Sequence, residues 1–279
     1  MHQPQPPQNQ TSIGVFDSGI GGLSNLRALM KAMPQQHFTY IADMAYAPYG
    51  EHSDGYILER SQKVAHWLRS IQHTRGLVIA CNTATAAAAK LLREQFGPGW
   101  PIIGVEPALK PAAALSQSGR IGIMATASTL GSSKFQTLMR RVHENERIAL
   151  QLFLCPCEGL AKAIDDDDVQ QIQGLVQRYC QELSKSRPDV VVLGCTHYPL
   201  VSDFFVQAMP GVHVLDASEA VARRAKSVFM SDAAPGLHHF ERHSRLAAYT
   251  TADPQHLQKA IERWLPEIGM PPEVRHVDI

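Results

Sequence analysis

Two short apolar runs in this sequence each end in a cysteine that small polar residues surround. The run at 76–80 leads into Cys81, and the run at 190–193 leads through a glycine into Cys195. Short β-branched runs of this kind are typical of buried strands. Open α/β sheets place their ligands at the carboxyl ends of such strands. The pattern therefore predicts two halves of one molecule, each presenting a thiol to a shared cleft.

Two facing thiols suit the inversion of a carbon centre by acid/base chemistry. One thiolate removes a proton from one face of the carbon, and the other thiol delivers a proton to the opposite face. Each cysteine has a candidate acid/base partner. For Cys81 it is Asp17, which follows the first predicted strand, and for Cys195 it is His197, two residues further on. The exchange formally requires no cofactor, and no segment resembles a cofactor site. We expect none to be bound.

The segment at 17–22, DSGIGG, forms an acidic, glycine-rich turn between a predicted strand and a predicted helix. The amide groups of a helix start can bind an anion. The spacing differs from both the dinucleotide fingerprint and the P-loop, so a small carboxylate is a better guest than a pyrophosphate. A tight turn with no ligand remains the alternative. The hydroxyls of Thr126 and Thr129 open another predicted helix, where they can cap it or hold a carboxylate.

Predicted strands and helices alternate along the chain, which favours parallel sheets and an α/β fold. We expect strands near 11–16, 38–42, 76–80, 101–105, 120–124, 150–154, 190–193 and 213–215, with an edge strand at 245–249. Helices are expected at 55–73, 84–96, 169–184, from 218 and at 254–264. The acidic run at 165–168 is interpreted as a solvated helix start.

The repeated cysteine-tipped strand indicates two lobes related by an approximate two-fold axis, with the active site in the cleft between them. We expect a disordered leader at 1–10, lobe A at 11–106 and 217–279, and lobe B at 107–216.

Composition excludes several classes of protein. The 279 residues hold 26 Lys plus Arg and 26 Asp plus Glu, so no net charge favours nucleic acid or an anionic membrane. No apolar run approaches the roughly 18 residues of a membrane span. The five cysteines are odd in number and lack disulfide-framework spacing, which favours free thiols and a cytoplasmic location.

Five motifs together resemble the glutamate racemase family. They are D-S-G-I-G-G at 17–22, P-Y-G at 48–50, C-N-T-A-T at 81–85, A-T-x-x-T at 125–129 and G-C-T-H-Y-P at 194–199. The resemblance spans about residues 13–225 and implies two α/β lobes, no cofactor, and glutamate as substrate. It also implies D-glutamate supply for peptidoglycan in a bacterial cytoplasm, and it permits a homodimer.

By this resemblance Cys81 takes the proton from D-glutamate and Cys195 takes it from L-glutamate, with Asp17 and His197 assisting. Substrate contacts are implied for Asp17, Ser18, Pro48, Tyr49, Gly50, Cys81, Asn82, Thr83, Thr126, Thr129, Cys195, Thr196 and His197. Glu158 is the candidate for a further acidic position of the family. The chain departs from the family at Cys155-Pro156-Cys157, where a more apolar segment is usual.

Other functions stay open at this point. A racemase of the same fold acting on aspartate or another amino acid fits the same motifs, because pocket volume selects the side chain. A non-catalytic amino-acid-binding protein is a second alternative, although binding needs no acid/base pair. Cys155 and Cys157 are weak candidates for a metal or redox pair, and Cys180 is expected in the core.

Overall fold

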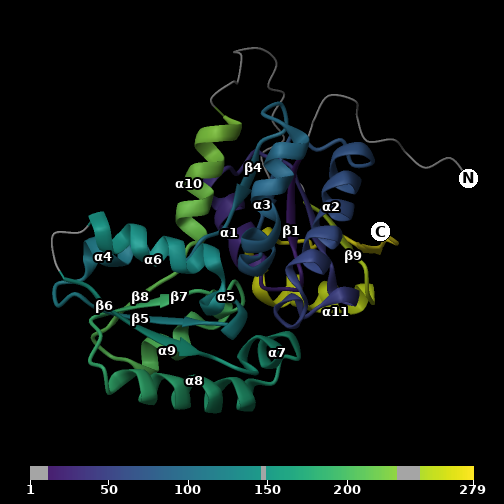
Figure 1. The fold of residues 1–279 in the computed structure, drawn as a ribbon. Coiled ribbons are helices and arrows are strands. Elements are labelled where there is room, and N and C mark those ends of the chain that lie inside the picture. The colour runs from purple at the N-terminus through teal and green to yellow at the C-terminus, as the bar shows by residue number, and fades with distance from the viewer. Residues whose placement is uncertain (1–11, 146–148, 231–245) are drawn as a thin grey trace, which may run out of the picture.

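The computed structural model describes residues 12–145, 149–230 and 246–279. It is an α/β fold with two parallel sheets, as the alternating pattern predicts (Figure 1). The leader expected at 1–10 lies outside the described residues. Within the described residues no helix is long and apolar enough to cross a membrane.

The first sheet has six strands in the order β10-β9-β2-β1-β3-β4. Their bounds are Ile13–Asp17 for β1, Phe38–Ala42 for β2, Leu77–Ile79 for β3, Ile102–Gly104 for β4, Leu246–Thr250 for β9 and Val274–His276 for β10. Every pair is parallel. Strands β1, β2 and β3 are buried along their whole length, which explains why their sequences are continuous apolar runs rather than alternating ones.

Helices cover both faces of this sheet. Helices α2 (Asp54–Ser70) and α3 (Asn82–Phe96) pack on one face, and α1 (Leu23–Ala32) and α10 (Ser218–Phe229) pack on the other. Helix α11 (Pro254–Trp264) packs beside β9 and β10. Short 3₁₀ turns lie at Met44–Tyr46 (η1), Tyr49–Glu51 (η2), Tyr198–Val201 (η3) and Pro266–Ile268 (η4).

The second sheet has four strands in the order β6-β5-β7-β8. These are β5 (Arg120–Ala125), β6 (Gln151–Pro156), β7 (Val190–Leu193) and β8 (His213–Leu215). Helices α4 (Leu109–Leu115) and α6 (Ser133–Asn145) cover one face, and α7 (Leu160–Asp165), α8 (Val169–Ser184) and α9 (Ser202–Ala208) cover the other. The five-residue helix α5 (Ala127–Gly131) follows β5.

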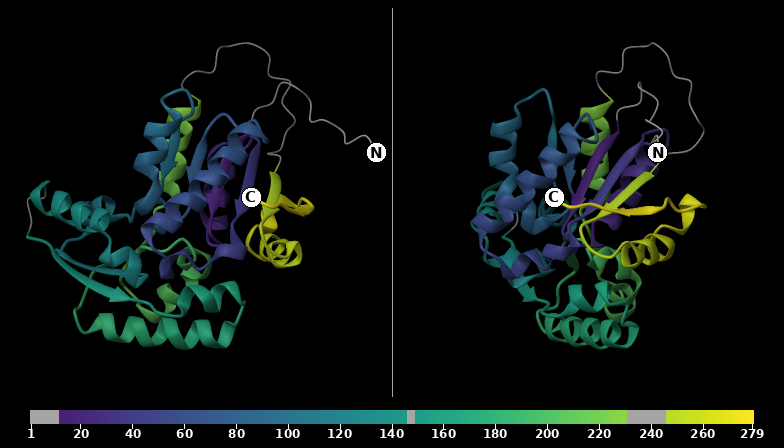
Figure 2. Two further views of the ribbon diagram at one scale, coloured as in Figure 1. Left: turned by 45° about the vertical axis from the view of Figure 1, so that its right-hand side comes forward. Right: turned by 90° about the vertical axis from the view of Figure 1, so that its right-hand side faces the viewer.

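The two sheets repeat one topology. Strands β2-β1-β3-β4 and β6-β5-β7-β8 have the same order, and the two cysteines follow the third strand of each set. Figure 2 shows the second lobe at one end of the molecule and α10 returning to stand beside the first. We propose the domain limits expected above, with 107–216 inserted into the first lobe, since β5 to β8 and their helices all lie in this range.

One strand prediction was wrong in its position. The strand expected at the sheet edge near 245–249 is β9, and it lies inside the sheet because β10 pairs with its outer side. The prediction omitted β10, three residues long, and helices α4, α6, α7 and α9. Segments β10, α4, α7 and α9 are three to seven residues long and too short to establish a period, whereas α6 has apolar residues at helical spacing that the prediction overlooked.

Candidate active site

A cavity of about 350 Å³ lies between the two lobes at the carboxyl ends of their strands. Twelve of the thirteen residues implied by the family resemblance line it, and both cysteines are among them. Those twelve are Ser18, Pro48, Tyr49, Gly50, Cys81, Asn82, Thr83, Thr126, Thr129, Cys195, Thr196 and His197. The exception is Asp17, which is fully buried behind the cavity wall.

The Cys81 thiol caps helix α3. Its Sγ accepts the amide hydrogen of Ala84 at 3.4 Å and lies 3.5 Å from Ser18 Oγ. Burial raises the pKa of Cys81 to about 12, and the nearby Asp17 carboxylate adds to the shift. This thiol is therefore protonated at neutral pH and is poised to give a proton to a ligand.

Asp17 ends β1, which pairs directly with β3, the strand that carries Cys81. Burial raises the pKa of Asp17 to about 6, although the charge of His197 and two amide hydrogen bonds oppose the shift. Oδ2 accepts the Gly22 amide at 2.5 Å, while Oδ1 is buried without a hydrogen-bond partner among the described residues.

The glycine-rich turn differs from its expected role. We expected the amide groups at the start of α1 to hold a small carboxylate, but the Asp17 carboxylate of the chain itself takes the Gly22 amide. The turn serves instead for close approach of the lobes, because a Cβ on Gly21 would lie 2.5 Å from His197 Nδ1. Ser24, on α1, also donates to the carbonyl of Thr196.

The second thiol, that of Cys195, lies at one end of a series of three side chains in contact. Cys195 Sγ lies 3.6 Å from His197 Nδ1, and His197 Nε2 lies 3.1 Å from Asp165 Oδ1. Burial disfavours the charged imidazole, but the Asp165 carboxylate outweighs it and raises the pKa of His197 well above its usual value. A protonated His197 stabilises negative charge on the adjacent sulfur, as in other cysteine–histidine pairs.

The sequence interpretation missed Lys162, Asp165, Asp166 and His256, which all line the cavity, and Asp165 is the one that contacts His197. The acidic run is not simply a solvated helix start. Asp165 pairs with His197, Asp166 with Lys162, and Asp167 with Arg263 of α11, while Asp168 caps α8. Glu158, the expected acidic position, is exposed and does not line the cavity.

The P-Y-G turn at 48–50 presents main-chain amide groups to the cavity, and not the hydroxyl of Tyr49. The Tyr49 ring is 1% exposed, and its hydroxyl donates to Asp43. The amide groups of Tyr49 and Gly50 have no acceptor among the described residues, and both residues line the cavity. In the A-T-x-x-T motif, Thr126 Oγ1 accepts the Thr129 amide at 3.2 Å and therefore performs the expected capping role.

The other three cysteines are buried, and all five thiols of the chain are free. Cys180 lies in the core on α8, as expected. Cys157 donates to the carbonyl of Cys155. Among the described residues no group of three or more His, Cys, Asp or Glu side chains could hold a metal ion.

Two α/β lobes that each bring a thiol and an acid/base partner to one cavity have the architecture of a two-base racemase. The sequence model for Asp/Glu/hydantoin racemases matches residues 18–225. The chain belongs to this family. It is 40% identical over 225 residues to the glutamate racemase of Pseudomonas syringae pv. tomato, covering 80% of each chain.

Solved structures agree with this placement. The Escherichia coli glutamate racemase, in complex with L-glutamate and the activator UDP-MurNAc-Ala, superposes with a TM-score of 0.79 at 29% identity. The match covers 96% of this chain and 97% of that one. The Thermus thermophilus glutamate racemase, in complex with β-chloro-D-alanine, gives a TM-score of 0.76 at 28% identity over 97% of this chain and 98% of its own.

Proposed function

We propose that this protein interconverts L- and D-glutamate by proton transfer at the α-carbon between Cys81 and Cys195. The observation that carries the proposal is the placement of one thiol from each lobe at a single cavity, each beside its own acid/base partner. The glutamate racemases to which the chain is similar support glutamate as the substrate.

In the L-to-D direction Cys195 is the base. The protonated His197, which Asp165 holds through Nε2, stabilises the thiolate form of Cys195, and this thiolate removes the α-proton of L-glutamate. The protonated Cys81 then delivers its proton to the opposite face of the carbanion. The D-to-L direction reverses these roles, with Asp17 accepting the proton that Cys81 must lose before it acts as a base.

Polar groups of the cavity match the charges of an amino acid. Asn82 Oδ1 is a buried acceptor without a partner in the described residues, and an ammonium group in the cavity supplies the donor it needs. The amide groups of Tyr49 and Gly50 and the hydroxyls of Thr83, Thr126, Thr129 and Thr196 are donors for carboxylates. Fixed donors near the α-carboxylate stabilise the charge that spreads onto it as the proton leaves.

The biological setting is proposed from the family. We assign the D-glutamate product to peptidoglycan synthesis in the cytoplasm, with no cofactor, no nucleic-acid partner and a homodimer as the assembly. The equal counts of acidic and basic residues agree with a small-molecule substrate rather than a polyanion.

The experiment that tests the function uses purified protein, L-glutamate, D₂O and a chelator, with no added pyridoxal phosphate or metal. Loss of optical activity together with α-deuterium uptake is the expected result, and L-aspartate in parallel should show neither. Turnover of aspartate instead of glutamate would assign a different substrate. Binding of glutamate with no isotope exchange would indicate a binding protein.

The raised pKa of Asp17 predicts an acidic limb in the pH profile of racemisation. Asp17 accepts a proton only as the carboxylate, so kcat/KM should fall as the pH drops below about 6, where an ordinary aspartate would remain active to about pH 4. The fall should be equal for both enantiomers, because their equilibrium constant is fixed. Rates of wild type and Asp17→Asn between pH 5 and pH 8 test this. A limb near pH 6 that persists unchanged in Asp17→Asn would contradict the assignment.

A further inference from the structure

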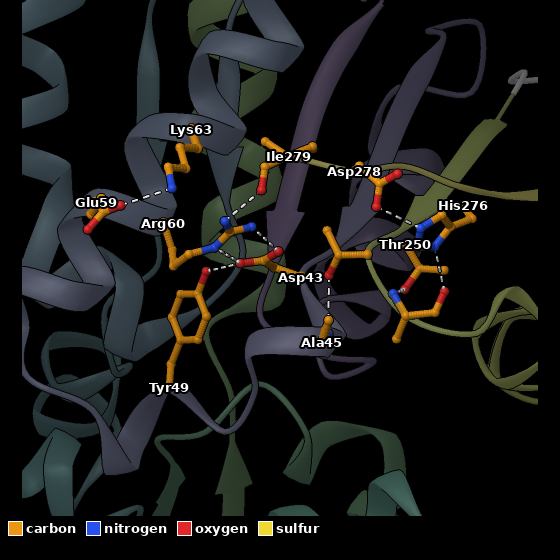
Figure 3. Close-up of polar contacts among 12 residues, drawn as sticks. Asp43, Ala45, Tyr49, Glu59, Arg60, Lys63, Thr250, His276, Asp278 and Ile279 are labelled. Carbon is orange, nitrogen blue, oxygen red and sulfur yellow. Dashed lines mark hydrogen bonds and ion pairs between the residues drawn. The ribbon is translucent and has the colours of Figure 1, made fainter.

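A buried ion pair lies directly behind the P-Y-G turn. Arg60 of α2 binds Asp43 through two contacts, Nε to Oδ2 at 3.0 Å and an Nη to Oδ1 at 2.8 Å (Figure 3). Its other Nη donates to the carbonyl of Ile279 at 2.6 Å, and its guanidinium lies 3.5 Å from the centre of the Tyr46 ring. Asp43 is fully buried and Arg60 is 3% exposed.

The hydroxyl of Tyr49 completes this network from the cavity side. It donates to Asp43 Oδ2 at 2.5 Å, while the ring packs edge-on against Phe16, the neighbour of Asp17. Burial, followed by the Asp43 carboxylate, raises the pKa of Tyr49, so the phenol remains a donor. The side chain of Tyr49 therefore anchors the turn, and its main chain faces the cavity.

Asp43 also ties the turn to the catalytic strand. Its amide donates to the carbonyl of Asp17 at 2.9 Å, immediately after the paired strands β1 and β2. One residue thus joins three elements, through its amide to the end of the strand that carries Asp17 and through its carboxylate to the turn at 48–50 and to helix α2. The contacts with charged groups are strong and directional, and a planar guanidinium with two contacts fixes orientation as well as distance.

We propose that Asp43 and Arg60 are positioning residues, which act through the Tyr49 hydroxyl to hold the free amide groups of Tyr49 and Gly50 at the substrate carboxylate. This inference rests on the proposed glutamate racemase activity. Neither Asp43 nor Arg60 lines the cavity, so neither is a catalytic residue. Displacement of the turn should weaken substrate binding and leave proton transfer by the thiols largely unchanged.

The test compares Tyr49→Phe, Arg60→Lys and the double variant in the racemisation assay. Each single change should raise KM about tenfold, the equivalent of one hydrogen bond, with kcat altered by less than about threefold. Both changes break the same connection, which runs from Arg60 through Asp43 to Tyr49. The double variant should therefore raise KM no more than the larger single change. A KM that is unchanged in both single variants, or effects that multiply to about a hundredfold in the double variant, would overturn the proposal.

Two control variants on α2 separate positioning from loss of stability. Lys63→Met removes the exposed ion pair with Glu59, one turn from Arg60, and should leave KM and the melting temperature unchanged. Leu68→Ala empties a fully buried site on the same helix and should lower the melting temperature without raising KM. A Leu68→Ala variant that raises KM as much as Arg60→Lys would assign the network a structural role alone.

Wild-type protein in the same assay tests the racemase function separately, since its inactivity would overturn that proposal first.

Discussion

Replacing either Cys81 or Cys195 by alanine should lower the rate of glutamate racemisation by at least about 10³-fold, the usual scale for loss of an acid/base group. Both thiols face one cavity from different lobes, and no other thiol lines it. Inversion needs a donor on one face and an acceptor on the other, so one remaining cysteine cannot complete the reaction. Circular dichroism of the glutamate pool measures the rate, and the melting temperature reports whether the fold is retained.

Isotope exchange makes this prediction specific to each thiol. Cys81→Ala keeps the Cys195 base, so deuterium should enter L-glutamate slowly without inversion, and D-glutamate should not exchange. Cys195→Ala should show the reverse. Cys180→Ala is the matched control, because that thiol is buried in the core on α8 and should leave racemisation intact. Substantial turnover in Cys81→Ala or Cys195→Ala would end the two-thiol mechanism.

Removal of the partners of Cys195 should slow proton abstraction from L-glutamate more than from D-glutamate. His197→Asn deletes the group 3.6 Å from the sulfur. Asp165→Asn removes the carboxylate that holds His197 in the charged form and should cost about 10- to 100-fold in rate, as for groups that orient a ligand or base. In Asp165→Asn the carboxylate no longer offsets the burial that disfavours the charged imidazole, so the pKa of His197 should fall.

The measurement is the primary isotope effect with each α-deuterated enantiomer. In both variants it should increase for L-glutamate, because that proton transfer becomes rate-limiting, while kcat/KM falls equally in both directions. Asp167→Asn is the charge-matched control. Asp167 pairs with Arg263 on the surface and has a positive φ of 56°, which asparagine tolerates. Equal isotope effects for the two enantiomers in His197→Asn would indicate a shared positioning role.

The sequence by itself determined the fold class and most of the residues around the cavity. Strands such as β2 and β8 and helix α11 begin and end where the apolar pattern and the turn residues place them, since these signals act over a few residues. The motif spacing placed each cysteine at a strand end. The pairing of β1 with β3, which brings Asp17 close to Cys81, came from the structure.

Only the tertiary structure decided which of several similar side chains enters the site. Four consecutive aspartates look alike in sequence, yet Asp165 alone among them pairs with His197. The phenol of Tyr49 turns inward to Asp43, and the carboxylate of Asp17 takes the helix start that a substrate was expected to fill. These outcomes depend on which way each side chain turns in the folded protein, and burial then sets the pKa values. Local patterns contain neither the contacts nor the burial, because both arise only when the chain folds into its tertiary structure.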